Sequence, residues 1–178
     1  MSEIFEKSIA FKILLEIFRH AKIKEPEKNL NEIMQDNFQS FSLSYYAGNQ
    51  GAQYEFGLKP HKDFGLITLL WISEPGLEVF YDNAWHSVDP KPGYIVINLA
   101  NALVEMLEGS AVNCHSALHR VRPVNAERLS FGLFIDSSLK KPIYNLVSEK
   151  QLHPDGKSYL EEQFRNTYSD PLVIKSKL

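Results

Sequence analysis

The chain has 178 residues and a formal net charge of −3, and 44% of its residues are hydrophobic. This length corresponds to about one domain, and the hydrophobic content is ordinary for a globular protein that buries a core. The mild acidity and the scattered basic residues indicate neither nucleic acid nor an anionic membrane surface as a partner.

The single cysteine, Cys114, excludes an intramolecular disulfide and a cysteine-rich metal site. The N-terminus lacks the basic and apolar regions of a secretory signal. No apolar run approaches the roughly 20 residues that span a bilayer. These features predict a cytoplasmic protein in a reducing compartment, with no membrane segment.

The first part of the chain is expected to be helical. Apolar residues recur at four-residue steps across 3–21, which predicts an amphipathic helix, and Pro26 separates it from a shorter helix over 27–35. The sequence then changes to alternating or short apolar runs that predict strands over 40–48, 65–73, 77–81, 84–88, 94–99, 116–121 and 129–136. Further helices are expected over 101–109 and 157–168.

Short strands separated by turns every eight to twelve residues are typical of a β-sandwich or barrel. We therefore expect one mainly β domain across residues 1–178. Within it, a helical segment over 1–37 precedes a β core over 38–140. Residues 141–178 form a C-terminal extension that contains a helix.

Residues 59–70, KPHKDFGLITLL, place a histidine and an aspartate two positions apart before an apolar run. Alternate residues of a strand share a face, so His61 and Asp63 are expected to converge while Lys62 faces away. An imidazole and a carboxylate placed this way could share one divalent cation. As an isolated motif, the pair also fits a surface His–Asp pair at a strand edge.

A third ligand must come from elsewhere, and His119 has the most favourable setting because it follows apolar residues within a predicted strand. His115 lies at the entrance to that strand. The remaining histidines, His20, His86 and His153, are expected in solvated or ordinary sheet positions. Two histidines and one carboxylate on one face of an iron leave three open positions, as in the non-haem Fe(II) oxygenases.

Arg128 and Ser130 follow His119 in the chain and share parity in a predicted strand. A turn over 122–127 is expected to fold this strand back along the one that bears His119. A planar guanidinium beside a hydroxyl is suited to holding a carboxylate. Taken alone, Arg128 also fits a structural arginine paired with a distant acid.

In this order, the motifs resemble the 2-oxoglutarate/Fe(II)-dependent dioxygenase superfamily, in the branch related to isopenicillin N synthase and the plant flavonoid and hormone oxygenases. The resemblance covers about residues 38–140. It is carried by SYYAG, HKDFGLITLL, GLEVFYDNAWHSVDPKPGYIVINLANAL, HSALHRV and ERLSFGLFID. It implies that the β core is a double-stranded β-helix, or jelly roll, with flanking helices.

The resemblance also implies two cofactor sites and no catalytic residue beyond the metal ligands. The implied residues are His61, Asp63 and His119 for Fe(II), and Arg128, Ser130 and Tyr46 for the distal carboxylate of the co-substrate 2-oxoglutarate. The implied reaction uses O2, oxidises a small organic substrate, foremost by hydroxylation, and releases succinate and CO2. Desaturation or ring closure would use the same site.

The chain departs from the family in several places. The N-terminal region of other members is expected to be missing, which would leave a surface through which two copies could associate. Ser44 replaces a frequent asparagine, and Ala100-Asn101 replaces a common Gly-Asp pair. Two alternative functions follow: a 2-oxoglutarate-independent Fe(II) oxidase, or a non-catalytic jelly-roll interaction module. A cupin-type metal enzyme would need more histidines.

Overall fold

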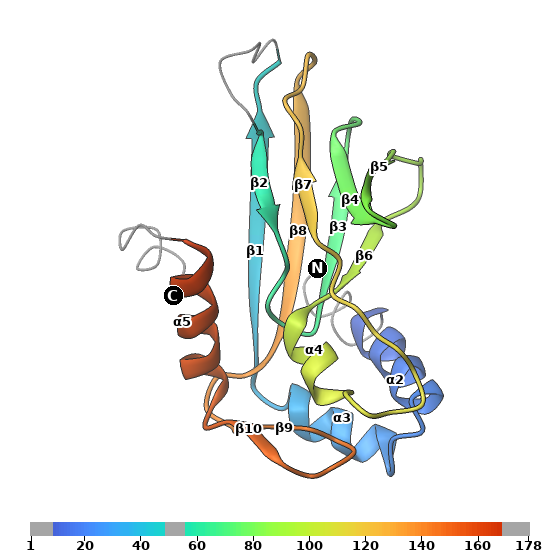
Figure 1. Ribbon diagram of the computed structural model, residues 1–178, viewed down its shortest axis with the longest axis vertical. Helices are drawn as coiled ribbons and strands as arrows, with labels where there is room; N and C mark the ends of the chain where they lie inside the picture. The colour runs from blue at the N-terminus through green and yellow to red at the C-terminus, as the bar shows by residue number, and fades with distance from the viewer. Residues whose placement is uncertain (1–8, 49–55, 169–178) are drawn as a thin grey trace.

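The computed structural model describes residues 9–48 and 56–168 (Figure 1). The part of the first expected helix over 3–8 lies outside these residues. The helices are α2 (Phe11–His20), α3 (Pro26–Met34), α4 (Asn101–Met106) and α5 (Gly156–Thr167). Throughout the described part of the chain, every helix is too short or too polar to cross a lipid bilayer.

The strands confirm the prediction of a mainly β chain and add two short strands that the sequence did not indicate, β9 and β10, while β2 is the strand expected to carry His61. In chain order, the strands are β1 (Asn37–Tyr46), β2 (Leu58–His61), β3 (Ile67–Ile72), β4 (Leu77–Tyr81), β5 (Ala84–Val88), β6 (Val96–Leu99), β7 (His119–Val121), β8 (Arg128–Ser138), β9 (Ile143–Tyr144) and β10 (Gln151–His153).

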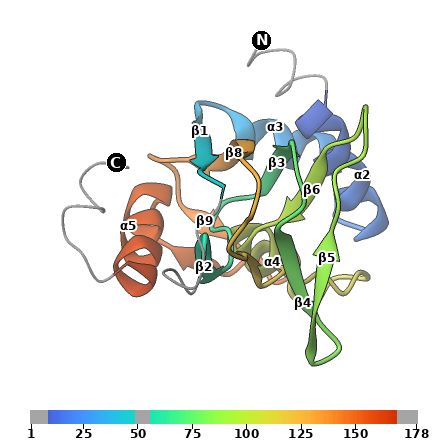
Figure 2. The same ribbon diagram turned by 90° about the horizontal axis from the view of Figure 1, so that it is seen from above.

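Two four-stranded antiparallel sheets form the core of the fold. The first sheet has the order β1-β8-β3-β6, and the second sheet has the order β2-β7-β4-β5. In Figure 2 the labelled strands of the second sheet, β2, β4 and β5, lie below those of the first sheet, β1, β3, β6 and β8. The chain changes sheet at every step from β1 to β4 and again at every step from β5 to β8. This arrangement of two facing sheets confirms the predicted jelly roll.

The expectation that the strand of Arg128 folds back along the strand of His119 is wrong. β7 pairs with β2 and β4 in the second sheet, whereas β8 pairs with β1 and β3 in the first sheet. Because β7 already has a hydrogen-bonded neighbour on each side, it offers no free edge to β8. The segment over 122–127 therefore carries the chain across the sandwich instead of forming a hairpin.

The main hydrophobic core lies between the first sheet and the N-terminal helices. Alternation along β3 directs Ile67 toward this core, where it joins Ile135 of β8 and the fully buried Leu14 and Phe18 of α2. The other face of β3, including Thr68, is turned toward the second sheet. The first sheet therefore has an outer face toward α2 and an inner face that is available to line a cavity.

A glycine between β2 and β3 allows the connection to pass close to β8. A Cβ atom on Gly65 would lie 2.7 Å from the carbonyl oxygen of Ile135 and would overlap the carboxylate of Asp136. We expect Gly65→Ala to lower the free energy of unfolding by about 3 kcal/mol or more, because neither neighbour can withdraw from the sheet. Chemical denaturation of the purified protein measures this loss.

Gly93→Ala is the matched control. Gly93 has a left-handed φ of 79° but nothing near its missing side chain. Alanine at this position should cost only about 1–2 kcal/mol of backbone strain. Equal losses for the two variants would contradict a steric role for Gly65.

Candidate active site

The two candidate histidine ligands are cross-strand neighbours in the second sheet. His61 is the last residue of β2, and it pairs in register with His119, the first residue of β7. Their ring centroids are 4.3 Å apart. The antiparallel pairing therefore brings together two side chains that are 58 positions apart in sequence, from 119 minus 61.

Each imidazole is oriented by a backbone carbonyl two residues earlier. His61 Nδ1 lies 2.9 Å from the Lys59 oxygen, and His119 Nδ1 lies 3.0 Å from the Ala117 oxygen. A carbonyl oxygen can only accept, so each Nδ1 carries the proton and each Nε2 keeps its lone pair. This tautomer is the one that a metal-binding histidine needs.

Asp63 is not in the strand of His61, contrary to the expectation from sequence. It lies in the connection between β2 and β3, because the chain must leave the second sheet there to enter the first. The side chains still converge. Asp63 Oδ1 is 4.0 Å from His61 Nε2 and 3.8 Å from His119 Nε2.

The connection that carries Asp63 is held by the start of α4. Backbone N–H groups of Asn101 and Ala102 donate to the carbonyl oxygens of Asp63 and Phe64, each at 2.9 Å. The Tyr159 hydroxyl of α5 donates to the same Phe64 oxygen, also at 2.9 Å. These hydrogen bonds therefore fix the backbone that carries the Asp63 carboxylate.

The cluster has the chemistry of a divalent metal site. The ligand atoms of its three residues lie within 4.8 Å of one another. Two atoms that each lie about 2.1 Å from one ion are separated by about 3–4.2 Å, and the two measured separations from Asp63 fall in this range. Within residues 9–48 and 56–168, no other group of three His, Cys, Asp or Glu side chains converges in this way.

Arg128 is buried without a complete set of hydrogen-bond partners. Only 1% of its surface is exposed. Its Nε donates to the Glu74 carbonyl oxygen at 3.1 Å, and its guanidinium lies 4.9 Å from the centre of the Tyr46 ring. Its Nη1 has no hydrogen-bond partner in the described part of the chain. Burial lowers the pKa of Arg128, although contact with the Tyr46 hydroxyl opposes that shift. A buried cation with an unused donor needs an anionic partner.

One cavity of about 410 Å³ contains all six residues singled out from the sequence. His61, Asp63 and His119 contribute from the second sheet and its connection to the first. Tyr46, Arg128 and Ser130 contribute from β1 and β8. The expected parity of Arg128 and Ser130 is observed, since both are buried while Leu129 between them is exposed.

Two residues near the metal cluster were not identified from sequence. Asn98 of β6 donates from Nδ2 to Asp63 Oδ2 at 3.3 Å, which leaves Oδ1 directed at the histidines. Asp136 lines the same cavity, and burial together with the charge of Asp63 raises its pKa to about 7. Asp136 shares the parity of Arg128 and Ser130, so the alternation of β8 could have indicated that it faces inward.

Helix α5 closes the side of the cavity between the edge strands β1 and β2. Figure 2 shows it beside these two strands. Leu160, Phe164 and Tyr168 line the cavity from this side. Phe164 packs edge-on against Phe64, with ring centroids 5.1 Å apart. The C-terminal helix, which the sequence predicted without a role in the site, thus forms one of its walls.

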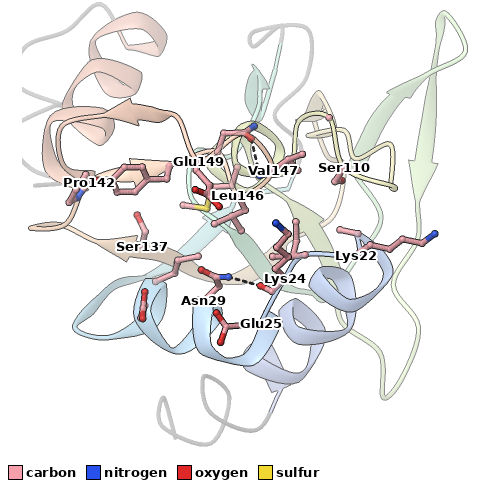
Figure 3. Close-up of a pocket in the computed structure, with 18 of the residues that line it drawn as sticks. Lys22, Lys24, Glu25, Asn29, Ser110, Ser137, Pro142, Leu146, Val147 and Glu149 are labelled. Carbon is pink, nitrogen blue, oxygen red and sulfur yellow. Dashed lines mark hydrogen bonds between the residues drawn. The ribbon is translucent and has the colours of Figure 1, made fainter.

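A larger groove of about 1010 Å³ lies elsewhere, where the α2–α3 connection faces β9 (Figure 3). Two of its polar side chains are hydrogen-bonded within the groove. Lys141 Nζ donates to Gln35 Oε1 at 2.6 Å, and Asn29 Nδ2 donates to the Lys24 carbonyl oxygen at 2.7 Å. None of the three residues of the metal cluster lines this groove, and we assign the active site to the smaller cavity.

A jelly roll with two histidines and one aspartate at a sheet edge defines the class of non-haem metal oxygenases. Comparison with known proteins agrees with this class. Residues 37–137 match the 2OG-Fe(II) oxygenase superfamily. The chain belongs to this family.

Several curated relatives share about a third of their matched residues with this chain. Thebaine 6-O-demethylase of Papaver somniferum is 34% identical over 141 residues, which are 74% of this chain and 38% of that protein. Gibberellin 20 oxidase 4 of Arabidopsis thaliana is 31% identical over 135 residues, which are 72% of this chain and 34% of that protein. The chain thus spans little more than a third of the length of these relatives.

Solved structures support the fold. A full-length Neurospora crassa protein in complex with alpha-KG superposes with a TM-score of 0.76 at 20% identity, over 91% of this chain and 54% of that one. The dioxygenase for auxin oxidation 1 of Arabidopsis thaliana, solved with 2-oxoglutarate, gives a TM-score of 0.65 at 19% identity, over 83% of this chain and 51% of that one.

Removal of one imidazole should abolish tight metal binding. We expect His119→Ala to weaken Fe(II) binding by more than about 100-fold, since it removes one of the three candidate ligands. Anaerobic calorimetry with Fe(II) measures the affinity, and circular dichroism checks the fold. His86→Ala is the control, because His86 lies on β5, does not line the cavity, and places Nε2 3.0 Å from the Tyr81 carbonyl oxygen. Unchanged Fe(II) affinity in His119→Ala would contradict the ligand assignment.

The buried Asp136 carboxyl should make the stability of the metal-free protein depend on pH. Its pKa of about 7 lies above the value near 4 of a carboxyl in an unfolded chain. The folded protein therefore holds this proton more tightly, and the resulting stabilisation is complete below about pH 4 and lost as the pH rises through 7. Relative to Asp136→Asn, the protein should lose on the order of 2–3 kcal/mol between pH 5 and 8.

Urea denaturation of both proteins across this pH range measures the effect. The difference between them isolates Asp136 from other titrating groups. A difference that does not change with pH would show that the carboxyl is already ionised in the folded protein at pH 5.

Proposed function

We propose that the protein is a non-haem Fe(II)/2-oxoglutarate-dependent oxygenase that oxidises a small organic substrate with O2, foremost by hydroxylation, and releases succinate and CO2. A single observation carries this proposal. One cavity holds a metal-ligand triad and a buried arginine with an unused donor.

The metal ligands in this proposal are His61, Asp63 and His119. Bound Fe(II), with 2-oxoglutarate and O2, would supply the oxidising chemistry, which no side chain of the cavity can supply alone. The two neutral imidazoles and one carboxylate add a single negative charge to a divalent ion. The site therefore keeps a net positive charge that favours an anionic co-substrate. Asn98 keeps the Asp63 carboxylate in one orientation.

Arg128 and Ser130 are proposed to bind the distal carboxylate of 2-oxoglutarate, together with the hydroxyl of Tyr46. Arg128 and Tyr46 are opposite each other in the β1–β8 register, and Ser130 is opposite Ser44. A carboxylate beside Arg128 would accept from the Nη1 group that lacks a partner. It would also neutralise a guanidinium whose burial is otherwise unfavourable.

The remaining walls suit a substrate with both polar and apolar parts. Ser40, Ser42 and Ser44 face the cavity from alternate positions of β1, while Phe164 lines it from α5. These groups would orient a small molecule and exclude water from the metal.

We also propose a cytoplasmic location, because Fe(II) and the free thiol of Cys114 both persist in a reducing compartment.

The test is an anaerobic titration of the metal-free protein with Fe(II) and then 2-oxoglutarate. Chelation of the iron should produce a visible metal-to-ligand charge-transfer band. Arg128→Ala should weaken 2-oxoglutarate binding at least about 100-fold, since it removes the charge partner of a buried carboxylate. Arg122→Ala is the control, because Arg122 is an exposed arginine on the connection to β8 and should leave the band unchanged.

The titration separates the proposal from its alternatives. Iron binding without the band would favour a 2-oxoglutarate-independent Fe(II) oxidase. A folded protein that binds no iron would favour a non-catalytic jelly-roll module. Either outcome would overturn the proposed function.

A further inference from the structure

The outer face of the first sheet carries a continuous set of apolar side chains. They come from alternate positions of neighbouring strands, on the face of the sheet opposite Ser42 and Arg128, although Phe41 also contributes to the lining of the cavity. This outer apolar face consists of Phe41, Leu43, Tyr45, Trp71, Ile97, Leu129 and Phe131.

Aromatic contacts join the outer apolar face across three strands. Phe131 of β8 lies between Leu43 of β1 and Trp71 of β3 in the sheet register. Its ring centroid is 5.9 Å from that of Phe41 and 5.2 Å from that of Trp71. These side chains therefore form one patch and are not scattered exposures.

The described helices leave the outer apolar face uncovered. In Figure 1, α2 and α3 lie at the lower end of the molecule, and β1 and β8 extend well above them. Phe41 is 66% exposed, and Leu43 and Tyr45 are each 59% exposed. Lower on the same sheet, Ile67 and Ile135 are fully buried against α2. The outer apolar face thus continues the core of the protein into solvent.

The exposed area is close to that of a stable protein interface. A fully exposed large apolar side chain offers about 200 Å², so the exposed fractions of the six most exposed members correspond to about 600 Å². This value is at the upper limit for an ordinary monomer surface, about 300–600 Å². It would supply most of the roughly 800 Å² per partner in a standard interface.

We propose that the outer apolar face binds a second copy of this chain in a two-fold symmetric dimer. None of its seven side chains is charged, although Glu127 contacts the patch at Tyr45. Two copies of this face would therefore meet little like-charge repulsion when they pack together. Two sheets with apolar faces pack about 10 Å apart with their strands nearly aligned, as in a β-sandwich. In a dimer with a two-fold axis through the patch, β1 of each copy would pack against the first sheet of the other. Both patches would then be buried, so assembly would stop at two copies.

The experiment is analytical ultracentrifugation of the full chain in the metal-free state, from 1 to 100 µM. The expected mass at the highest concentration is twice the 20.4 kDa of one chain. Phe41→Glu places two buried charges in the interface and should give a monomer at the same concentration. Tyr81→Glu is the matched control, because Tyr81 is a 74% exposed aromatic at the β4–β5 turn, and it should remain dimeric.

A second measurement reports on the outer apolar face directly. Trp71 belongs to it, and the other tryptophan, Trp85, lies on the second sheet. Dilution should shift tryptophan emission to longer wavelength as Trp71 becomes exposed, and Trp71→Phe should remove that shift. These measurements require no catalysis, so they remain informative if the proposed function fails.

Two outcomes would overturn the proposal. The first is a monomer at 100 µM for the unsubstituted chain, which would assign the outer apolar face to a different occupant. The second is a dimer that survives Phe41→Glu with its fold intact by circular dichroism, which would place the dimer contact on another surface.

Discussion

The short connection between β2 and β3 is the constraint on which the site depends. It leaves the second sheet at His61 and enters the first at Ile67. The start of α4 holds its carbonyl oxygens, and the N–H of Leu66 donates to the Ile135 carbonyl oxygen at 2.7 Å. Because it is bound to both sheets, this connection sets the position of the Asp63 carboxylate relative to the histidines of the second sheet and to Arg128 of the first.

Burial of polar groups explains the rest of the cavity. A sandwich filled only by apolar side chains would be more stable, yet the inner faces here contribute Asp63, His119, Arg128, Ser130 and Asp136. Each is unfavourable in a dry interior unless it is paired. Asp136 shares the cavity with the metal cluster, and Arg128 Nη1 there lacks a partner among the described residues, so the site keeps more polar groups than its internal hydrogen bonds satisfy. Such an excess is typical of a site that is completed by its ligands.

The sequence predicted the residue types of the site better than their arrangement. Alternation was sufficient to place Arg128 and Ser130 on one buried face, because β8 is long and regular. Spacing alone could not show that Asp63 lies outside a strand, since a chain crossing between sheets leaves no periodic signal. The partners of β7 were mispredicted because adjacent strands usually pair, and only the full topology shows that both of its edges are occupied. The contact of Asn98 with Asp63 could not be predicted for a similar reason, because it depends on the pairing of β6 with β3.

The alternation of β1 has a consequence for local stability. Its inward residues Ser40, Ser42 and Ser44 bury little apolar area, and its outward residues are largely exposed. As an edge strand, it is therefore held mainly by its backbone hydrogen bonds to β8. Strands of this kind open more readily than the core in native-state hydrogen exchange. β1 ends at Tyr46, which lines the cavity. A partner bound to the outer side of β1 would slow these openings and would therefore also hold Tyr46 in place within the site.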